Sequence, residues 1–148
     1  MSNNIFVMLK NEIFLSAFLA WLVAQLLKVI IYAARNKKFN FKLLLGSGGM
    51  PSSHSATVMA LATAIGRTQG WESPMWIVTL TFAIIIMTDA VGVRRAVGQQ
   101  ATILNKMLDE FCTDGKIGET RLKELLGHTP VEVIVGALLG IGMAIVFT

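Results

Sequence analysis

The hydrophobic positions of the chain gather into four segments separated by polar stretches: 13–34, 55–67, 75–93 and 131–147. A helix needs roughly 20 mostly apolar residues to cross a bilayer. The second segment is the shortest, and we expect its helix to begin about one turn earlier than residue 55. The pattern predicts an all-α integral membrane protein with about four transmembrane helices, forming one membrane-embedded domain over residues 1–148.

Small residues mark the faces on which these helices should pack. In the fourth segment Gly136 and Gly140 have the GxxxG spacing. The second segment is rich in alanine, at Ala56, Ala60, Ala62 and Ala64. Small side chains let helix backbones approach closely within a membrane, so we expect these two segments to make close helix contacts.

Two polar stretches, 36–50 and 94–127, fall on the same side of a four-helix topology. Residues 99–111 predict an amphipathic helix suited to the membrane surface, with Ile103, Leu104, Met107 and Leu108 on its apolar side. Residues 119–126 predict a second, shorter helix. The two stretches and their borders hold ten Lys and Arg residues, against only Lys10 and Arg67 on the other side. The positive-inside rule therefore places this face of a multi-pass cell-membrane protein in the cytoplasm.

Composition supports the membrane assignment. The chain has 148 residues, of which 54% are hydrophobic and only 15% charged, whereas a soluble domain needs about a quarter charged. The net charge of +4 fits an anionic partner such as a phosphate headgroup. The basic residues form no groove with interleaved aromatics, so nucleic acid is not expected. A single cysteine excludes an intrachain disulfide.

Residues 46–55, Gly-Ser-Gly-Gly-Met-Pro-Ser-Ser-His-Ser, form the first candidate site. Pro51 presets a helix start that Ser52 or Ser53 can cap. His54 would then lie on the first turn, where backbone amides and the helix dipole attract anions. A capped helix with an incidental histidine explains the same residues, and local chemistry leaves both interpretations open.

The second candidate site begins at His128, directly before the fourth segment. Thr129 and Glu132 form a capping box around Pro130, so Glu132 could serve only the helix end. Glu132 also follows His128 by four residues, close enough to orient its imidazole. Glu132 can cap the helix and orient the His128 imidazole at the same time.

Charged residues inside the apolar segments are further candidates. Lys28 and Arg35 are seven residues apart and share a helix face; they could bind a ligand or reach the headgroups by snorkelling. Asp89 precedes Arg94 and Arg95. This suggests either a structural ion pair between Asp89 and an arginine or an arginine that binds phosphate while Asp89 positions the other. No carboxylate or thiol ligands accompany the two histidines at the spacing of a metal site.

These motifs together resemble the type 2 phosphatidic acid phosphatase superfamily, which includes vanadium haloperoxidases. Residues 51–54, Pro-Ser-Ser-His, resemble its Pro-Ser-Gly-His motif, and residues 128–136 are similar to its His-xxx-Asp-Val-xx-Gly motif. The spacing of Lys28 and Arg35 matches the first family motif. Residues 89–95, Asp-Ala-Val-Gly-Val-Arg-Arg, resemble a stretch of the small divergent branch.

The resemblance implies metal-independent hydrolysis of a lipid phosphate or diphosphate through a phosphohistidine, with no cofactor. His128 would be the nucleophile, Glu132 would orient it, and His54 would protonate the leaving group. Phosphate would be held by a set of cations and hydroxyls, with Asp89 supporting them: Lys28, Arg35, Ser52, Ser53, and Arg94 or Arg95. Phosphatidic acid, phosphatidylglycerophosphate and polyprenyl phosphates all suit such a site.

The chain departs from the family pattern at four positions. Asn36 replaces a proline, Ser53 a glycine and Glu132 an aspartate, and position 122 is Leu where the family has arginine. Family members typically have six spans, so the uncovered faces here predict a homodimer. Two other functions remain open: a non-catalytic binder of phospholipid or prenyl phosphate, and a small transporter component, to which Asp89 points.

Overall fold

The computed structural model describes residues 6–7, 9–38, 49–111 and 127–148, with the backbone alone at 93–95 and 108–111. Its long helices are α2 (Glu12–Asn36), α3 (Ser53–Gln69), α4 (Pro74–Val91), α5 (Val93–Phe111) and α6 (Pro130–Phe147). Within those ranges there is no β-strand. The predicted all-α fold is confirmed, and the four apolar segments correspond to α2, α3, α4 and α6.

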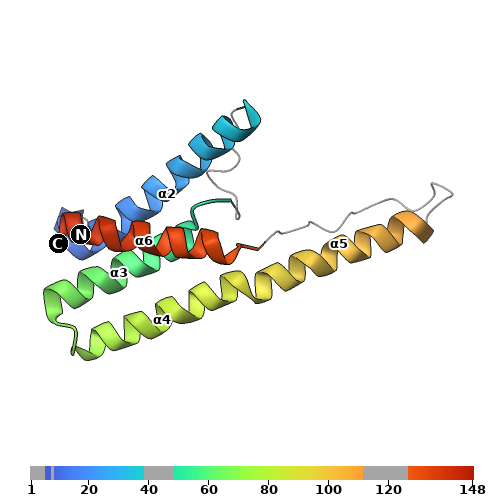
Figure 1. The fold of residues 1–148 in the computed structure, drawn as a ribbon. Helices are drawn as coiled ribbons and strands as arrows, with labels where there is room; N and C mark the ends of the chain where they lie inside the picture. Colours follow the sequence, from blue (N-terminus) through green and yellow to red (C-terminus); the bar gives the residue numbers. More distant parts are fainter. Residues whose placement is uncertain (1–5, 8, 39–48, 112–126) are drawn as a thin grey trace.

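Helix α3 lies at the centre and contacts α2, α4 and α6. Helices α2, α3, α4 and α6 alternate in direction, so the start of α2, the α3–α4 turn and the end of α6 meet at one end of the bundle (Figure 1). The opposite end carries the end of α2, the start of α3, the end of α4 and the start of α6. We call this opposite end the site end, because His54, His128 and Asp89 lie on or next to the helix ends that meet there.

Helix starts follow local sequence signals. Ser52 caps α3 and its side chain accepts a hydrogen bond from the Ser55 amide. Helices α4 and α6 each begin with proline, behind the caps Ser73 and Thr129, as the missing proline N–H allows at a first helical position. Helix α3 begins at Ser53, which confirms that it starts before residue 55.

Small residues form the contacts between α3 and its neighbours. Ala20 and Ala24 of α2 form a buried cluster with Ala56 and Ala60 of α3. On α6, a Cβ added to Gly136 would collide with the carbonyl oxygen of Ser52, and one added to Gly140 with that of Ala56. The GxxxG face therefore packs directly on the α3 backbone, as predicted.

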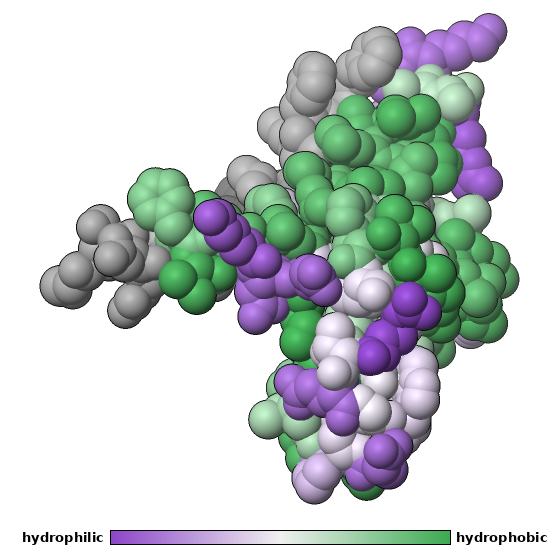
Figure 2. Space-filling view, turned by 90° about the vertical axis from the view of Figure 1, so that its left-hand side faces the viewer, coloured by the Kyte–Doolittle hydropathy of each residue, from purple (hydrophilic) through white to green (hydrophobic). Residues whose placement is uncertain are grey.

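Large apolar side chains cover the outside of the bundle. Among the described residues, α2, α6 and the stretch Pro74–Met107 are long and apolar enough to cross a membrane. Helix α3 has 17 residues and lies mostly buried among the others. Figure 2 shows hydrophobic residues over much of the surface, with hydrophilic residues gathered in separate patches. This is the distribution expected of a protein whose solvent is largely lipid.

The amphipathic helix predicted in the long polar stretch is present as α5. It begins at Val93, directly after Gly92 ends α4, rather than at residue 99. Its apolar residues Ile103, Leu104 and Met107 are exposed, and it extends away from the bundle in nearly the direction of α4 (Figure 1). The predicted short helix at 119–126 lies outside the described residues.

Candidate functional site

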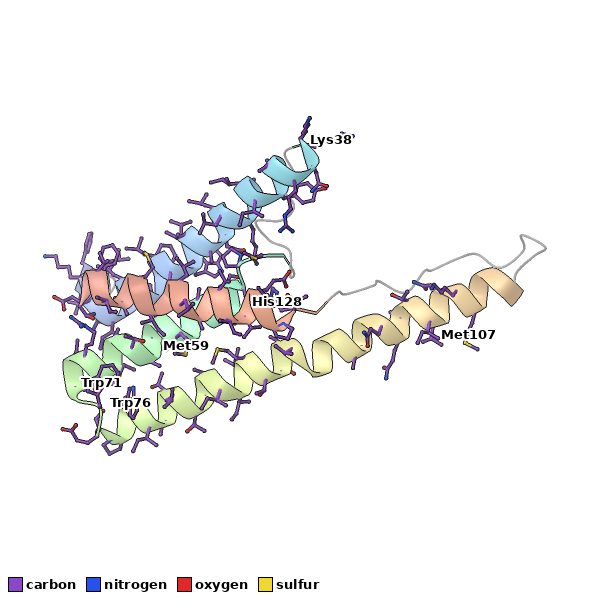
Figure 3. All side chains as sticks on the ribbon, in the orientation of Figure 1. Lys38, Met59, Trp71, Trp76, Met107 and His128 are labelled. Atoms are coloured by element: carbon purple, nitrogen blue, oxygen red, sulfur yellow. The ribbon has the colours of Figure 1, made fainter. Side chains whose placement is uncertain are left out.

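The two histidines meet at the site end. His54 is the second residue of α3 and is exposed, whereas His128 lies two residues before α6 and is only 3% exposed. Their ring centroids are 6.3 Å apart and the ring planes are inclined by 65°. Figure 3 shows His128 at the start of α6, at the opposite end of the bundle from Trp71 and Trp76.

Glu132 holds the His128 ring in a defined orientation. His128 Nδ1 lies 3.1 Å from Glu132 Oε2. An ionised carboxylate only accepts hydrogen bonds, so Nδ1 donates, and in the neutral ring Nε2 keeps the lone pair. His128 Nε2 is buried and has no hydrogen-bond partner in the described part of the chain. The geometry thus leaves a buried imidazole nitrogen without a hydrogen-bond partner in the described part of the chain, beside a second histidine.

Glu132 also caps the helix. Its Oε2 accepts a hydrogen bond from the Thr129 amide at 3.0 Å, and Thr129 Oγ1 accepts one from the Glu132 amide at 3.4 Å. The predicted capping box is present. The cap and the histidine contact therefore coexist on one carboxylate.

Two main-chain hydrogen bonds join the segments that carry the histidines. The His128 amide donates to the carbonyl of Ala90 in α4 at 3.1 Å, and the Ser52 amide donates to the carbonyl of Glu132 in α6 at 3.0 Å. The first bond fixes His128 against the end of α4. The second fixes the start of α3, and with it His54, against the first turn of α6. Neither bond was evident in the sequence.

Ser53 links α3 to the lysine of α2. Lys28 Nζ donates a hydrogen bond of 3.0 Å to Ser53 Oγ, and both residues are buried. Ser53 stands where the related motif has glycine, but it is the first helical residue of α3 and its φ is not positive. A side chain at this position therefore fits without strain, and its hydroxyl holds the lysine.

A cavity of about 170 Å³ lies between α2 and the start of α6. Lys28, Arg35 and Glu132 line it, together with Gly49 and Met50 before α3. The predicted common face of Lys28 and Arg35 is therefore present, and it faces this cavity. Neither histidine is among the lining residues, so Glu132 is the residue that belongs both to the cavity and to the histidine pair.

Tyr32 also lines the cavity, and it was not predicted. It follows Lys28 by four residues and precedes Arg35 by three, which on a helix is the same face. That periodicity was the available signal. Tyrosine brings a phenolic hydroxyl that can donate a hydrogen bond to a phosphate oxygen.

The remaining predicted residues are placed only in part. Asp89 is half-buried in the last turns of α4, next to Ala90. Arg94 and Arg95 begin α5 beyond Gly92, and their side chains lie outside the described residues, as does the glycine-rich stretch 46–48. Their contacts with phosphate stay predictions. Within the described ranges, no group of three or more His, Cys, Asp or Glu side chains could hold a metal ion.

Comparison with known proteins agrees with these motifs. The divergent PAP2 family matches residues 9–143 of the chain. The uncharacterized membrane protein YuiD of Bacillus subtilis (strain 168) is 41% identical over 150 aligned residues, covering 94% of this chain and 95% of its own. No solved structure matches the chain. By the extent of the family match and the identity to YuiD, the chain belongs to the divergent PAP2 family.

Proposed function

We propose that this membrane protein hydrolyses a lipid phosphate or diphosphate without a metal, through a phosphohistidine on His128. The observation that carries the proposal is the buried Nε2 of His128, oriented by Glu132 and placed beside His54. Membership of a PAP2-type family in the membrane supports a phosphorylated lipid as the substrate class.

The proposed reaction has two steps. His128 Nε2 attacks phosphorus, the bond from phosphorus to the lipid oxygen breaks, and His54 gives its proton to that oxygen. Water then attacks the phosphohistidine, His54 takes a proton from it, and the N–P bond breaks to release inorganic phosphate. Glu132 stabilises the positive charge that develops on the His128 ring, as a carboxylate does in a catalytic triad.

Electrostatic stabilisation completes the proposal. Phosphoryl transfer depends mainly on positioning and on charge held near the transferred oxygens. Lys28, fixed by Ser53, and Arg35 place two cations in one cavity beside Glu132. Tyr32 adds a hydroxyl donor to the same cavity. In this proposal the phosphate lies between that cavity and the histidine pair.

The test is phosphate release from phosphatidic acid, phosphatidylglycerophosphate and a polyprenyl diphosphate in mixed micelles with EDTA. Wild-type protein should release phosphate from at least one of them, and His128→Asn and His54→Asn should reduce the rate by about a hundredfold or more. Arg67→Gln, a charge removal at the opposite end of the bundle, should leave the rate unchanged. Full activity of His128→Asn would refute the phosphohistidine mechanism.

A second candidate function is binding of a lipid phosphate without turnover. The observation that favours it is the cation cavity itself, which the histidines do not line. A lipid phosphate that raises the melting temperature of the protein in detergent, with no phosphate released under any condition tested, would select binding over hydrolysis.

A further inference from the structure

An apolar groove of about 530 Å³ runs between α4 and α6. Ile84, Thr88 and Gly92 line its α4 side, and Pro130, Ile134 and Leu138 its α6 side. The volume falls within the roughly 300–1,000 Å³ typical of ligand pockets. Ile134 is 58% exposed and Leu138 63% exposed, so the groove opens sideways, toward the bilayer.

One end of the groove adjoins the candidate site. Pro130 follows His128 by two residues, and Gly92 follows Ala90 by two. Ala90 and His128 are joined by the main-chain hydrogen bond of 3.1 Å. The groove therefore starts next to the hydrogen-bonded pair of Ala90 and His128 and leads away from it along the two helices.

The length of the groove matches one leaflet. The lining runs from Gly92 to Ile84 and from Pro130 to Leu138. Each stretch covers eight steps along the chain, or about 12 Å at ~1.5 Å per residue. The hydrocarbon core of a bilayer is about 30 Å thick. Helix α6 has 18 residues, about 27 Å at ~1.5 Å per residue, so the groove covers roughly the half of this helix that is nearer the site end. A hydrocarbon chain from a single leaflet has this reach, whereas a helix of a second copy would need a face along the full span.

The described lining of the groove is almost entirely apolar. Among the described lining residues, Thr88 alone carries a hydroxyl, and its Oγ1 donates within α4 to the carbonyls of Ile84 and Ile85, both at 2.9 Å. A ligand in the groove would meet hydrocarbon alone, at a favourable ~0.8 kcal/mol for each buried methylene.

We propose that the α4–α6 groove binds a hydrocarbon chain of the same lipid whose phosphate enters the site at His128. The proposal rests on the function proposed above and narrows its substrate class. The substrate is a phosphorylated lipid with a chain long enough to fill about 12 Å, and short-chain or soluble phosphate esters are poor substrates because they leave the groove empty.

The test uses Ala137→Phe, which places a ring in the groove, and Gly142→Phe as its control. Ala137 lines the groove, whereas a side chain at Gly142, on the same helix, meets open space. Phosphate release is measured in EDTA with dioleoyl and dibutyryl phosphatidic acid. For the dioleoyl substrate, Ala137→Phe should lower kcat/KM by about tenfold or more, since pocket methylenes discriminate by such factors. For the dibutyryl substrate it should lower kcat/KM less than twofold.

A binding measurement separates this proposal from the proposed function. Vesicles of phosphatidylcholine receive a phosphatidic acid with a diazirine midway along one chain. After irradiation, wild type and Gly142→Phe should carry the label within 84–92 or 130–138, and Ala137→Phe should carry at least about fivefold less.

The outcomes are distinct. If wild type releases no phosphate but is labelled in the groove by phosphatidic acid, the hydrolysis proposal fails and the chain-binding proposal stands. Equal labelling by a phosphatidylcholine probe of the same chain would overturn chain binding, because the groove would then hold only bulk lipid. An unchanged preference of Ala137→Phe for the dioleoyl substrate would also overturn chain binding. If Ala137→Phe instead converts a dimer to a monomer in detergent, the groove is a contact between two copies.

Discussion

Glu132 combines tasks that are usually given to separate residues. Its carboxylate caps α6, contacts His128 and lines the cavity of Lys28 and Arg35. The sequence indicated the cap and the histidine contact, because both depend only on spacing within one helical turn. It did not indicate the cavity, which forms only when α2 and α6 lie side by side.

Two substitutions of Glu132 separate the effect of its negative charge from the effect of its side-chain length. Glu132→Gln keeps a side-chain oxygen that can accept from the Thr129 amide, so we expect the unfolding free energy in detergent to fall by less than about 1 kcal/mol. Phosphate release should fall by about a hundredfold or more, because no carboxylate then stabilises the charged His128 ring. Glu132→Asp, the residue of the related motif, should retain more activity than Glu132→Gln. Equal activities for Gln and Asp would contradict an electrostatic role.

The pair of Lys28 and Ser53 offers a second test at this scale. Ser53→Ala removes the hydrogen bond of 3.0 Å and leaves the Nζ of a lysine that is only 3% exposed without this acceptor. We expect a loss of about 1–3 kcal/mol in unfolding free energy. Lys28→Met removes the buried charge together with its need for a partner, so stability should stay equal or rise, while KM for the lipid phosphate rises. A Lys28→Met variant as unstable as Ser53→Ala would show that the pair acts mainly on the fold.

At the level of helices, the sequence predicted the four packed segments closely, because each is a continuous, mostly apolar run, and the cap of α6 was also predicted. Pro74 and Pro130 each begin a helix behind a hydroxyl cap. The sequence predicted the start of α5 at residue 99, whereas the helix begins at Val93. The residues after Gly92 have no comparable cap signal, and their charges are typical of a loop. Propensity within a segment could not reveal that the helix resumes one residue after α4 ends.

The glycine face of α6 is the element on which the site end depends. Gly136→Ala should destabilise the protein by about 1–3 kcal/mol, because the added methyl group meets the carbonyl of Ser52 and the backbones must separate. Activity should fall more than stability, since Ser52 precedes His54 by two residues and the start of α3 would move. Gly142→Ala is the matched control, with open space around it, and should cost nothing. Thermal unfolding and phosphate release are measured on both variants; equal losses would argue against the contact.

Across the whole molecule, the alternating directions of α2, α3, α4 and α6 carry residues distant in sequence to one end. The sequence predicted that end, because both polar stretches had to share a side. It could not predict the helix register that joins Ser52 to Glu132 and Ala90 to His128. Register depends on how side chains of different helices fit together, and no local pattern contains that information.

Sidedness can be measured with cysteine variants in a Cys112→Ser background. Gln69 lies at the α3–α4 turn and Lys38 just beyond α2, and both are exposed. The excess of Lys and Arg at the site end predicts a cytoplasmic position for that end. In intact cells a membrane-impermeant maleimide should therefore label Gln69→Cys at once, and Lys38→Cys only after permeabilisation. The reverse pattern would place the site on the outer face.

The main-chain bonds from Ser52 to Glu132 and from His128 to Ala90 have an evolutionary consequence. A backbone amide and a backbone carbonyl are present whatever amino acid occupies the position, proline amides excepted. Substitutions around the site that leave the contact of Gly136 with Ser52 intact can thus accumulate over generations without moving the two histidines relative to each other. Descendants of such a chain can lose most of their sequence likeness to distant relatives and still inherit the same spatial relationship.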